Sequence, residues 1–184
     1  MTQDQLLETM LKTTFVKADL MRRIRIVREY LEQKFFTPGE KKNLDVFLES
    51  QGEPKDEQSL ITTWGDDFFS SFSATNAYDY LEYMTSRVKD IPVVNLYVPV
   101  ELDFAQTMKI GQWFRENVDT WLLIEFHQEP ATFGGCAYAW NGTYHDYSFH
   151  HAIHTHIKEI RSVLDTFAKE KNDSDKQTGS SATI

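Results

Sequence analysis

The hydrophobic pattern of this 184-residue chain changes its period near Asp90, and that change divides the expected fold into two parts. Before Asp90, apolar residues recur at every third or fourth position, which is the period of an amphipathic helix. After it, Val93–Val98 is a short, β-branched apolar run ended by Pro99, as expected of a strand. The chain is therefore predicted to be α+β, with an all-helical N-terminal bundle (1–90) followed by a small α/β C-terminal domain (91–168).

Five helices are predicted in the N-terminal bundle. The longest follows from a run of apolar residues at spacings of three and four: Val16, Leu20, Ile24, Val27, Leu31 and Phe35. Thr37-Pro38-Gly39-Glu40 has the sequence of a capping box with proline at the first helical position, so a helix is predicted to begin there. The remaining helices centre on 6–11, 60–72 and 77–88. Short loops between amphipathic helices indicate a compact bundle.

The C-terminal domain is predicted to mix strands with two helices. A helix over 102–118 leads to a strand over 121–127, and strands over 135–140 and 143–145 flank Asn141-Gly142, the strongest short signal for a β-hairpin. A long final helix is expected to bury one apolar stripe, formed by Phe149, Ile153, Ile157, Ile160, Leu164 and Phe167. The polar residues 169–184 are predicted to form a disordered tail.

The composition narrows the classes of partner and compartment. With 28 acidic and 19 basic residues the formal net charge is -9, which disfavours nucleic acid and anionic membrane surfaces as the main partners. The sequence has no apolar run near the roughly 20 residues that span a bilayer, so no membrane insertion is expected. A single cysteine, Cys136, cannot form an internal disulfide and fits a reducing compartment. We therefore expect a soluble, intracellular protein.

Histidines provide the main candidate for metal chemistry. Five of the six histidines lie between His145 and His156, and His150 and His154, four apart on a helix, have a spacing that can share a zinc ion. However, His150 and His156 flank the apolar stripe on opposite sides, and the HExxH pattern is absent. Surface histidines without a metal are therefore the favoured interpretation, and a small metal-binding or metal-sensing protein that uses His145–His156 is the alternative.

No arrangement typical of catalysis is found in the sequence. Neither the G-x-S-x-G pattern of a nucleophile elbow nor a phosphate-binding Walker loop is present. Gly134-Gly135 precedes a strand rather than a helix, so it does not form a phosphate cradle. We therefore expect a protein that is not an enzyme and that needs no cofactor.

A cluster of arginines stands out in the acidic chain. Arg22, Arg23, Arg25 and Arg28 lie within seven residues of one predicted helix. Because they spread over more than one face of that helix, a solvated surface is the simpler interpretation. The alternative is a docking patch for an acidic segment of a partner.

The C-terminal half carries an ordered set of short motifs. Glu129-Pro130 is followed after three residues by Gly134-Gly135, then by the predicted hairpin, and Asp146-Tyr147-Ser148 opens the final helix. Proline fixes the backbone where a strand ends, paired glycines allow a bulge or a close approach, and Asp146 or Ser148 can cap a helix. In order and spacing, this set resembles the delta subunit of F-type ATP synthases, the oligomycin-sensitivity-conferring protein of mitochondria. The resemblance covers about residues 93–166, and Glu129 stands where aspartate is usual.

The resemblance implies a mechanical function. A delta-type subunit is a non-catalytic stator protein, whose N-terminal bundle of six helices binds the N-terminal helices of the alpha subunits in the catalytic head. Its C-terminal domain meets the C-terminus of the b stalk subunit, and the complex is attached to the cytoplasmic face of the cell membrane. This sequence departs from that pattern, because it predicts five helices and lacks the alanine- and tyrosine-rich opening helix. A helical adaptor of unrelated ancestry is a further alternative.

Overall fold

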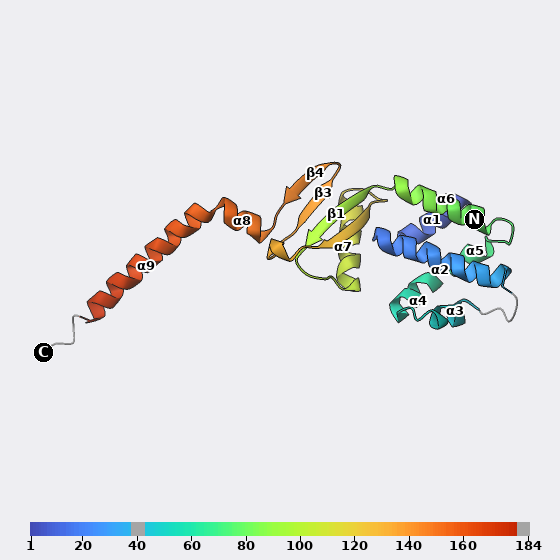
Figure 1. Cartoon of the computed structure of the whole chain (residues 1–184), viewed down its shortest axis with the longest axis horizontal. Helices are drawn as coiled ribbons and strands as arrows, with labels where there is room; N and C mark the ends of the chain where they lie inside the picture. Colours follow the sequence, from blue (N-terminus) through green and yellow to red (C-terminus); the bar gives the residue numbers. More distant parts are fainter. Residues whose placement is uncertain (38–42, 180–184) are drawn as a thin grey trace. The chain divides into compact units, whose positions relative to one another are not determined.

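The computed structural model describes the backbone of residues 1–37 and 43–179 and the side chains within these ranges as far as Lys169 (Figure 1). Contacts between Cα atoms divide the chain into two compact units. The first comprises residues 1–96 and 102–126, and the second comprises residues 97–101 and 127–184. The predicted boundary at Asp90 lies inside the first unit, because Ile91 and Val93 pack against the helical core and Leu123 belongs to it.

Six helices precede the first strand in the described residues. They are α1 (Gln3–Lys12), α2 (Lys17–Phe35), α3 (Leu44–Ser50), α4 (Lys55–Thr62), α5 (Gly65–Ser70) and α6 (Ala77–Arg87), followed by the short 3₁₀ helix η1 (Val88–Asp90). The prediction of five helices is wrong because the apolar repeat over 60–72 continues through a break. Gly65 has φ +77° at that break, a left-handed conformation that glycine adopts without strain.

Local signals account for two of the helix starts. The Thr2 side chain accepts a hydrogen bond from the Gln5 backbone and the Gln5 side chain binds the Thr2 backbone, which is a complete capping box. Helix α3 begins after Asn43, whose side chain accepts a hydrogen bond from the Val46 N–H. The capping box predicted at Thr37–Glu40 falls largely on residues 38–42, which lie outside the described residues.

The core of the first unit is apolar and rich in aromatic rings. Leu6 and Met10 of α1, Leu20 of α2 and Leu48 of α3 are fully buried. Four ring pairs of this core meet at tilted or edge-on angles with centroids 5.0–5.6 Å apart: Tyr30–Phe47, Tyr30–Phe69, Trp64–Phe68 and Phe68–Phe72. Such burial supplies the main free energy that holds short helices together.

A four-stranded mixed sheet completes the α+β fold and confirms the predicted fold class. The strands are β1 (Val93–Val98), β2 (Leu123–Gln128), β3 (Ala137–Trp140) and β4 (Thr143–Asp146), in the order β2-β1-β3-β4. Helix α7 (Phe104–Asn117) connects β1 to β2, and the 3₁₀ helix η2 (Pro130–Thr132) follows β2. The strand predicted over Val93–Val98 is confirmed at both ends.

The predicted hairpin is confirmed. Strands β3 and β4 pair antiparallel, with Trp140 opposite Thr143. Between them, Asn141 has φ 48° and Gly142 has φ 76°. Positive φ at both turn positions gives the turn a twist that matches the flanking strands, which is why Asn-Gly predicts it.

The predicted final helix is divided at His156 into α8 (Phe149–Thr155) and α9 (Ile157–Gly179). Helix α9 continues through residues 169–179, where composition predicts disorder. Ala168, Lys169, Glu170 and Lys171 have high helix propensity and extend a helix that has already begun. None of the helices in the described part of the chain has the length and apolar content that a bilayer crossing requires.

Candidate interaction surfaces

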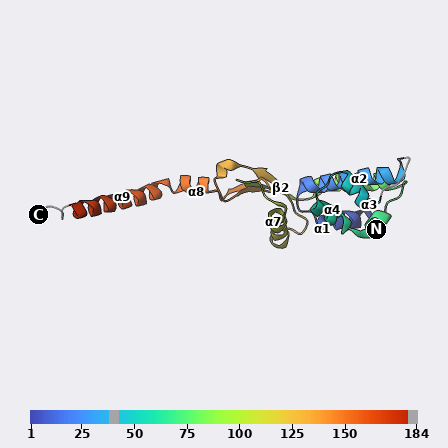
Figure 2. The same ribbon diagram turned by 90° about the horizontal axis from the view of Figure 1, so that it is seen from below.

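The apolar stripe of α8 and α9 is exposed, so the prediction that it forms core is wrong. Phe149, Ile153, Ile157, Ile160, Leu164 and Phe167 are each 38–65% exposed, and Val163 beside them is 54% exposed. In Figures 1 and 2, no other described element of the second unit runs alongside α9. The spacing identified apolar residues on one face, but the described part of the chain does not cover them. A monomer seldom leaves so large a contiguous apolar face in water unless it is a binding surface.

The residues Glu129 and Pro130 form a tight turn after β2. Glu129 is the N-cap of η2, and its carboxylate accepts a hydrogen bond of 3.3 Å from the Ala131 N–H. Pro130 occupies the first position of η2, where its missing N–H leaves no bond unmade. The Glu129 N–H donates to Val98 O at 2.7 Å, which ties this turn to the end of β1.

The two glycines lie where the backbone meets the start of α8. Gly134 has φ 147°, and a Cβ added there would lie 2.6 Å from the Phe149 ring. Gly135 has φ 72°, and its added Cβ would overlap the Tyr147 carbonyl. The Phe149 N–H donates to Gly134 O at 3.0 Å across this contact. Glycine is therefore required at both positions for close approach as well as for backbone conformation.

The residues Asp146 and Ser148 set the direction in which α8 leaves the sheet. An Asp146 carboxylate oxygen accepts from the Ser148 N–H at 2.8 Å, and Ser148 Oγ accepts from the His151 N–H at 3.1 Å. Hydrogen bonds from the side chain and then the backbone of Ser148 lower the pKa of Asp146. The motif residues Glu129, Pro130, Gly134, Gly135, Asp146 and Ser148 thus come together at one junction, which carries α8 with its apolar face outward.

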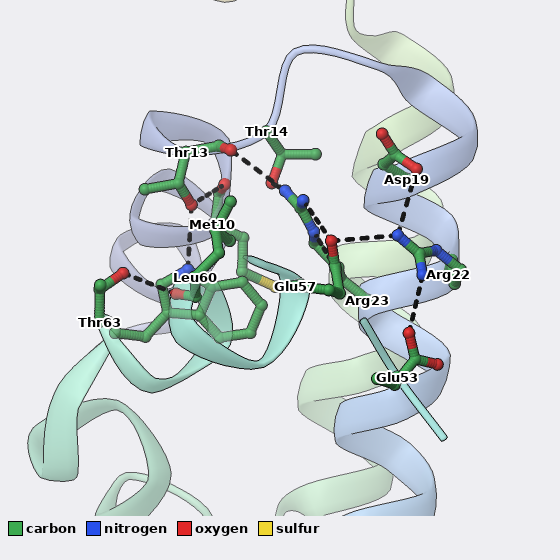
Figure 3. Close-up of polar contacts among 11 residues, drawn as sticks. Met10, Thr13, Thr14, Asp19, Arg22, Arg23, Glu53, Glu57, Leu60 and Thr63 are labelled. Carbon is green, nitrogen blue, oxygen red and sulfur yellow. Dashed lines mark hydrogen bonds and ion pairs between the residues drawn. The ribbon is translucent and has the colours of Figure 1, made fainter. Parts of the chain in front are cut away.

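The arginine cluster of α2 is divided between the interior and the surface (Figure 3). Arg23 is only 2% exposed, so both sequence interpretations, solvated surface and docking patch, are wrong for it. Its Nε and Nη2 donate to the two carboxylate oxygens of Glu57 at 2.6 and 2.8 Å. Its Nη1 donates to the Thr13 carbonyl at 3.1 Å and to Thr14 Oγ1 at 2.5 Å. A buried guanidinium is tolerated because its donors are matched in this way.

The other arginines of the cluster lie nearer the surface. Arg22 is partly exposed and pairs with Glu53 at 2.8 Å and with Glu57 at 3.1 Å. Arg25 is exposed and lies 3.8 Å from Glu29, and the buried Nε of Arg28 has no hydrogen-bond partner in the described structure. The cluster is thus part of the fold at Arg22 and Arg23, whereas Arg25 is exposed at the surface beside Glu29.

Arg115 of α7 is a second arginine that binds backbone carbonyls, is half-buried, and was not predicted from the sequence. Its guanidinium donates to the carbonyls of Leu11 and Thr14, and its Nε donates to Leu122 O at 3.2 Å. The guanidinium carbon lies 4.4 Å from the centre of the Phe15 ring. Burial lowers the pKa of Arg115 to about 10, so the group stays cationic at neutral pH. A lone arginine in an untidy amphipathic helix gives no sequence signal for such contacts.

The loop between α1 and α2 is therefore held by two arginines from different helices. We call Leu11–Val16, which comprises the last two residues of α1 and the loop after it, the clamped loop. Arg23 and Arg115 bind its carbonyl and hydroxyl groups, and Ile124 of β2 donates its N–H to Phe15 O at 2.8 Å. Gly111 of α7 lies so close to Phe15 that any side chain there would overlap it. These contacts join α7 and β2 to the helical core within the first unit.

The histidines are dispersed around the junction and α8. His145 stacks on Tyr138, with ring centroids 4.8 Å apart, whereas His156 binds Glu159 at 2.9 Å. His151 lies 3.9 Å from Asp146, and the rings of His150 and His154 meet edge-on at 6.3 Å. Within residues 1–37 and 43–169, no three histidine, cysteine or carboxylate side chains are arranged to hold a metal ion.

A groove runs along α1 in the first unit. It has a volume of about 350 Å³. Its apolar wall is formed by Leu7, Leu11, Ile91, Pro92 and Trp121. Its rim carries three carboxylates, Asp4, Glu8 and Asp90, against one cation, Arg87. An apolar groove with an acidic rim suits an amphipathic helix that carries basic residues.

A smaller aromatic patch lies at the far end of α2. Phe36 and Tyr78 are 46% and 49% exposed, and their rings stack with centroids 5.3 Å apart. Phe35 and Tyr83, by contrast, pack partly against the core.

Comparison with known proteins does not assign this chain to a family. A scan against protein-family models finds no match, and a search of curated proteins finds no relative.

Proposed function

We propose that this chain is a non-catalytic stator subunit of the delta type in a proton-translocating F-type ATP synthase. In that role it joins the N-terminal helices of the alpha subunits, in the catalytic head, to the C-terminus of the b stalk subunit. Rotation of the central stalk applies torque to the head, and a peripheral connection must prevent the head from turning with it.

The observation that carries the proposal is the exposed apolar face of α8 and α9. A delta-type subunit needs a surface in its C-terminal half that takes a stalk helix, and this face is apolar, helical and open. It begins at the junction of Glu129, Gly134, Gly135 and Ser148, which are the residues that carry the resemblance to the family. The groove along α1 supplies a separate surface for a helix from the head.

Two surfaces on one chain fit an adaptor. Each contact can be moderate in strength, because binding at one surface raises the effective concentration at the other. The alpha helix would lay its apolar side against Leu7, Leu11 and Trp121, with basic residues facing Glu8 and Asp90. This chain would lie at the cytoplasmic face of the cell membrane, where the b stalk holds the complex.

Reconstitution tests the proposal. A purified head that lacks its own delta-type subunit and a soluble C-terminal segment of b are mixed with or without this chain. We expect the head and the b segment to sediment together only when the chain is present, with no change in the ATP hydrolysis rate of the isolated head. If the chain sediments with neither component, the proposal is wrong.

A further inference from the structure

Strand β4 is the last strand of the sheet, so among the described residues one of its two edges has no neighbouring strand (Figure 1). Directly after β4, the Tyr147 N–H donates to Cys136 O at 2.9 Å. Hydrogen-bonded and non-hydrogen-bonded pairs alternate along an antiparallel ladder. Asp146 and Tyr144, one and three positions earlier, therefore direct their backbone N–H and C=O groups away from β3. These groups can pair with a further strand.

Three rings form a row across one face of the sheet and end at this open edge. Tyr97 of β1 stacks on His127 of β2 with ring centroids 4.9 Å apart, and it meets Tyr144 of β4 at 6.0 Å. Strand β3, which lies between β1 and β4, places the small side chain of Ala139 opposite Tyr144, which leaves room for the two tyrosine rings to meet. Tyr144 is 58% exposed. We call Tyr97, His127 and Tyr144 the aromatic row.

The surroundings of Tyr144 are acidic. Partial burial raises the pKa of the Tyr144 phenol, and the charges of Asp146 and Glu129 raise it further, so two carboxylates act on this ring. Residues 127–157 contain no lysine or arginine, and Asp146 lies 3.9 Å from His151 instead. The open end of the aromatic row thus combines a π face with carboxylates that lack a lysine or arginine from their own segment. Such a surface suits a cation carried by another molecule.

An arginine on an added strand fits both features. An antiparallel strand, which is the more stable pairing, would place the side chain opposite Tyr144 on the face of the aromatic row. A guanidinium is planar, so it stacks on an aromatic ring and its donors fit a carboxylate. Asp146 lies two positions from Tyr144 on the same face, within reach of a long side chain.

We propose that β4 binds an extended, arginine-bearing segment of a partner protein as a fifth strand, with the arginine stacked on Tyr144 and paired with Asp146. Backbone hydrogen bonds would supply affinity, and the arginine would supply specificity. The surface uses residues of neither the groove along α1 nor the apolar face of α8 and α9. The inference therefore goes beyond the contacts of the proposed stator function.

Peptide titration tests the inference. A blocked pentapeptide, Thr-Arg-Thr-Arg-Thr, is added to the isotope-labelled full chain, and we expect binding with the largest NMR shifts at the amides of Tyr144 and Asp146. Citrulline in place of both arginines removes the charge and keeps the shape, so it should raise the Kd about tenfold or more. N-methylation of the arginine amides, which face β4 in the added strand, should have an effect of the same size. N-methylation of the threonine amides, which face away, should change the Kd less than about threefold.

Variants of the chain locate the contact. Tyr144→Ala should raise the Kd about tenfold or more, whereas Tyr144→Phe keeps the ring and should change it less than about twofold. Asp146→Asn keeps an acceptor for the Ser148 N–H but removes the charge, so it should raise the Kd about threefold or more. Tyr78→Ala removes an exposed ring from the first unit and should leave the Kd unchanged.

Each comparison has a result that contradicts the inference. Equal binding of the arginine and citrulline peptides would overturn the cation site. Equal effects of N-methylation on the arginine and threonine amides would overturn strand addition. If Tyr144→Ala melts well below the wild type, the peptide comparisons with the wild-type chain decide. If the arginine peptide does not bind the wild-type chain, the inference is wrong, and the stator proposal stands because it rests on other residues.

Discussion

At the scale of the residue, the decisive group is the buried guanidinium of Arg23. It holds Glu57, Thr13 and Thr14 with four hydrogen bonds, so it connects α2, α4 and the clamped loop. A buried ion pair is not by itself evidence of high stability, because removing two charges from water is costly. Its importance lies in what happens when one partner is lost. Loss of Glu57 leaves Arg23 buried without a counterion, and loss of Arg23 leaves the buried Glu57 with only the partly exposed Arg22.

We therefore expect Arg23→Ala to lower the free energy of unfolding by about 3–5 kcal/mol, as is typical when one member of a buried pair is removed. Arg25→Ala, in the same helix but exposed, should cost less than about 1 kcal/mol. Urea denaturation followed by circular dichroism measures both. Equal effects from the two substitutions would contradict the assigned burial of Arg23.

The same pair predicts a pH dependence. Burial raises the pKa of Glu57, but hydrogen bonds and charge from Arg23, and then from Arg22, outweigh that effect and lower the pKa below its ordinary value. Since the folded state binds the proton less tightly than the unfolded state, this stabilisation is present above the unfolded pKa and is lost as pH falls through the folded pKa. Glu57→Gln should therefore destabilise the protein at pH 7 and flatten the loss of stability between about pH 5 and pH 3. An unchanged acid-unfolding curve would show that Glu57 does not contribute.

The sequence located the arginine cluster but not the burial of Arg23. Helical period assigns a residue to a face, and Arg23 lies between apolar and polar positions of α2. Its partner Glu57 is 34 positions away along the chain, and the clamped loop closes over it from another direction. Such placement depends on tertiary packing, which one amphipathic pattern does not encode.

At the scale of the element, the junction between η2, the hairpin and α8 determines where the apolar helix begins. Two glycines let backbone segments approach, and Ser148 caps the helix. Glycine is needed at position 135 for two separate reasons, the positive φ and the close approach of the Tyr147 carbonyl. Gly142 in the hairpin turn has a similar φ, +76°, but a Cβ there would meet nothing within 4 Å. Alanine substitutions at Gly135 and Gly142 therefore separate the effect of the close contact from that of the positive φ.

We expect Gly135→Ala to destabilise the chain by about 2–4 kcal/mol, since backbone strain of about 1–2 kcal/mol adds to a clash with the Tyr147 carbonyl. Gly142→Ala should cost only the strain, about 1–2 kcal/mol. Thermal unfolding of the two variants measures the difference. If Gly142→Ala proves as harmful as Gly135→Ala, the close contact at Tyr147 does not limit stability.

The histidines of α8 should be dispensable for folding. His150, His151 and His154 are exposed, and their described contacts lie at the surface. Replacing all three with glutamine should change the free energy of unfolding by about 1 kcal/mol or less. A large fall in melting temperature on addition of a chelator to the wild type would instead support the metal-binding alternative.

Local sequence signals predicted most of the helices and strands. They failed at the break between α4 and α5 and at α9, whose apolar face is not buried in the described structure. The strand Val93–Val98 and the Asn141-Gly142 hairpin follow from alternation and turn chemistry, which act over a few residues. The break at Gly65 was missed because the apolar repeat of Leu60, Trp64 and Phe68 continues across it. The face of α9 was assigned to the core because a stripe shows which residues avoid water and not which molecule covers them.

At the scale of the whole molecule, two surfaces belong to two different units. The groove along α1 lies in the first unit, and the face of α9 lies in the second. We expect substitutions at one surface not to alter binding at the other. An adaptor needs this independence, because each end must hold its own partner when the other is empty.

We therefore expect Leu164→Asp to abolish sedimentation with the b segment and to leave binding to the head unchanged. Glu8→Lys, on the rim of the groove, should weaken binding to the head and leave the b segment bound. Glu29→Lys makes the same charge change on α2, outside the groove, and serves as its control. If Glu8→Lys and Glu29→Lys weaken head binding equally, the effect is one of net charge rather than of the groove.

The clamped loop also has a consequence for the order of events during synthesis. Arg115 binds the carbonyls of Leu11 and Thr14, which are 104 and 101 positions earlier in the chain. A ribosome adds about 5–20 residues per second, so these carbonyls wait several seconds before Arg115 is made. The contacts from Arg115 are thus among the last that this loop can form, long after Arg23, which binds Thr13 and Thr14, has been made.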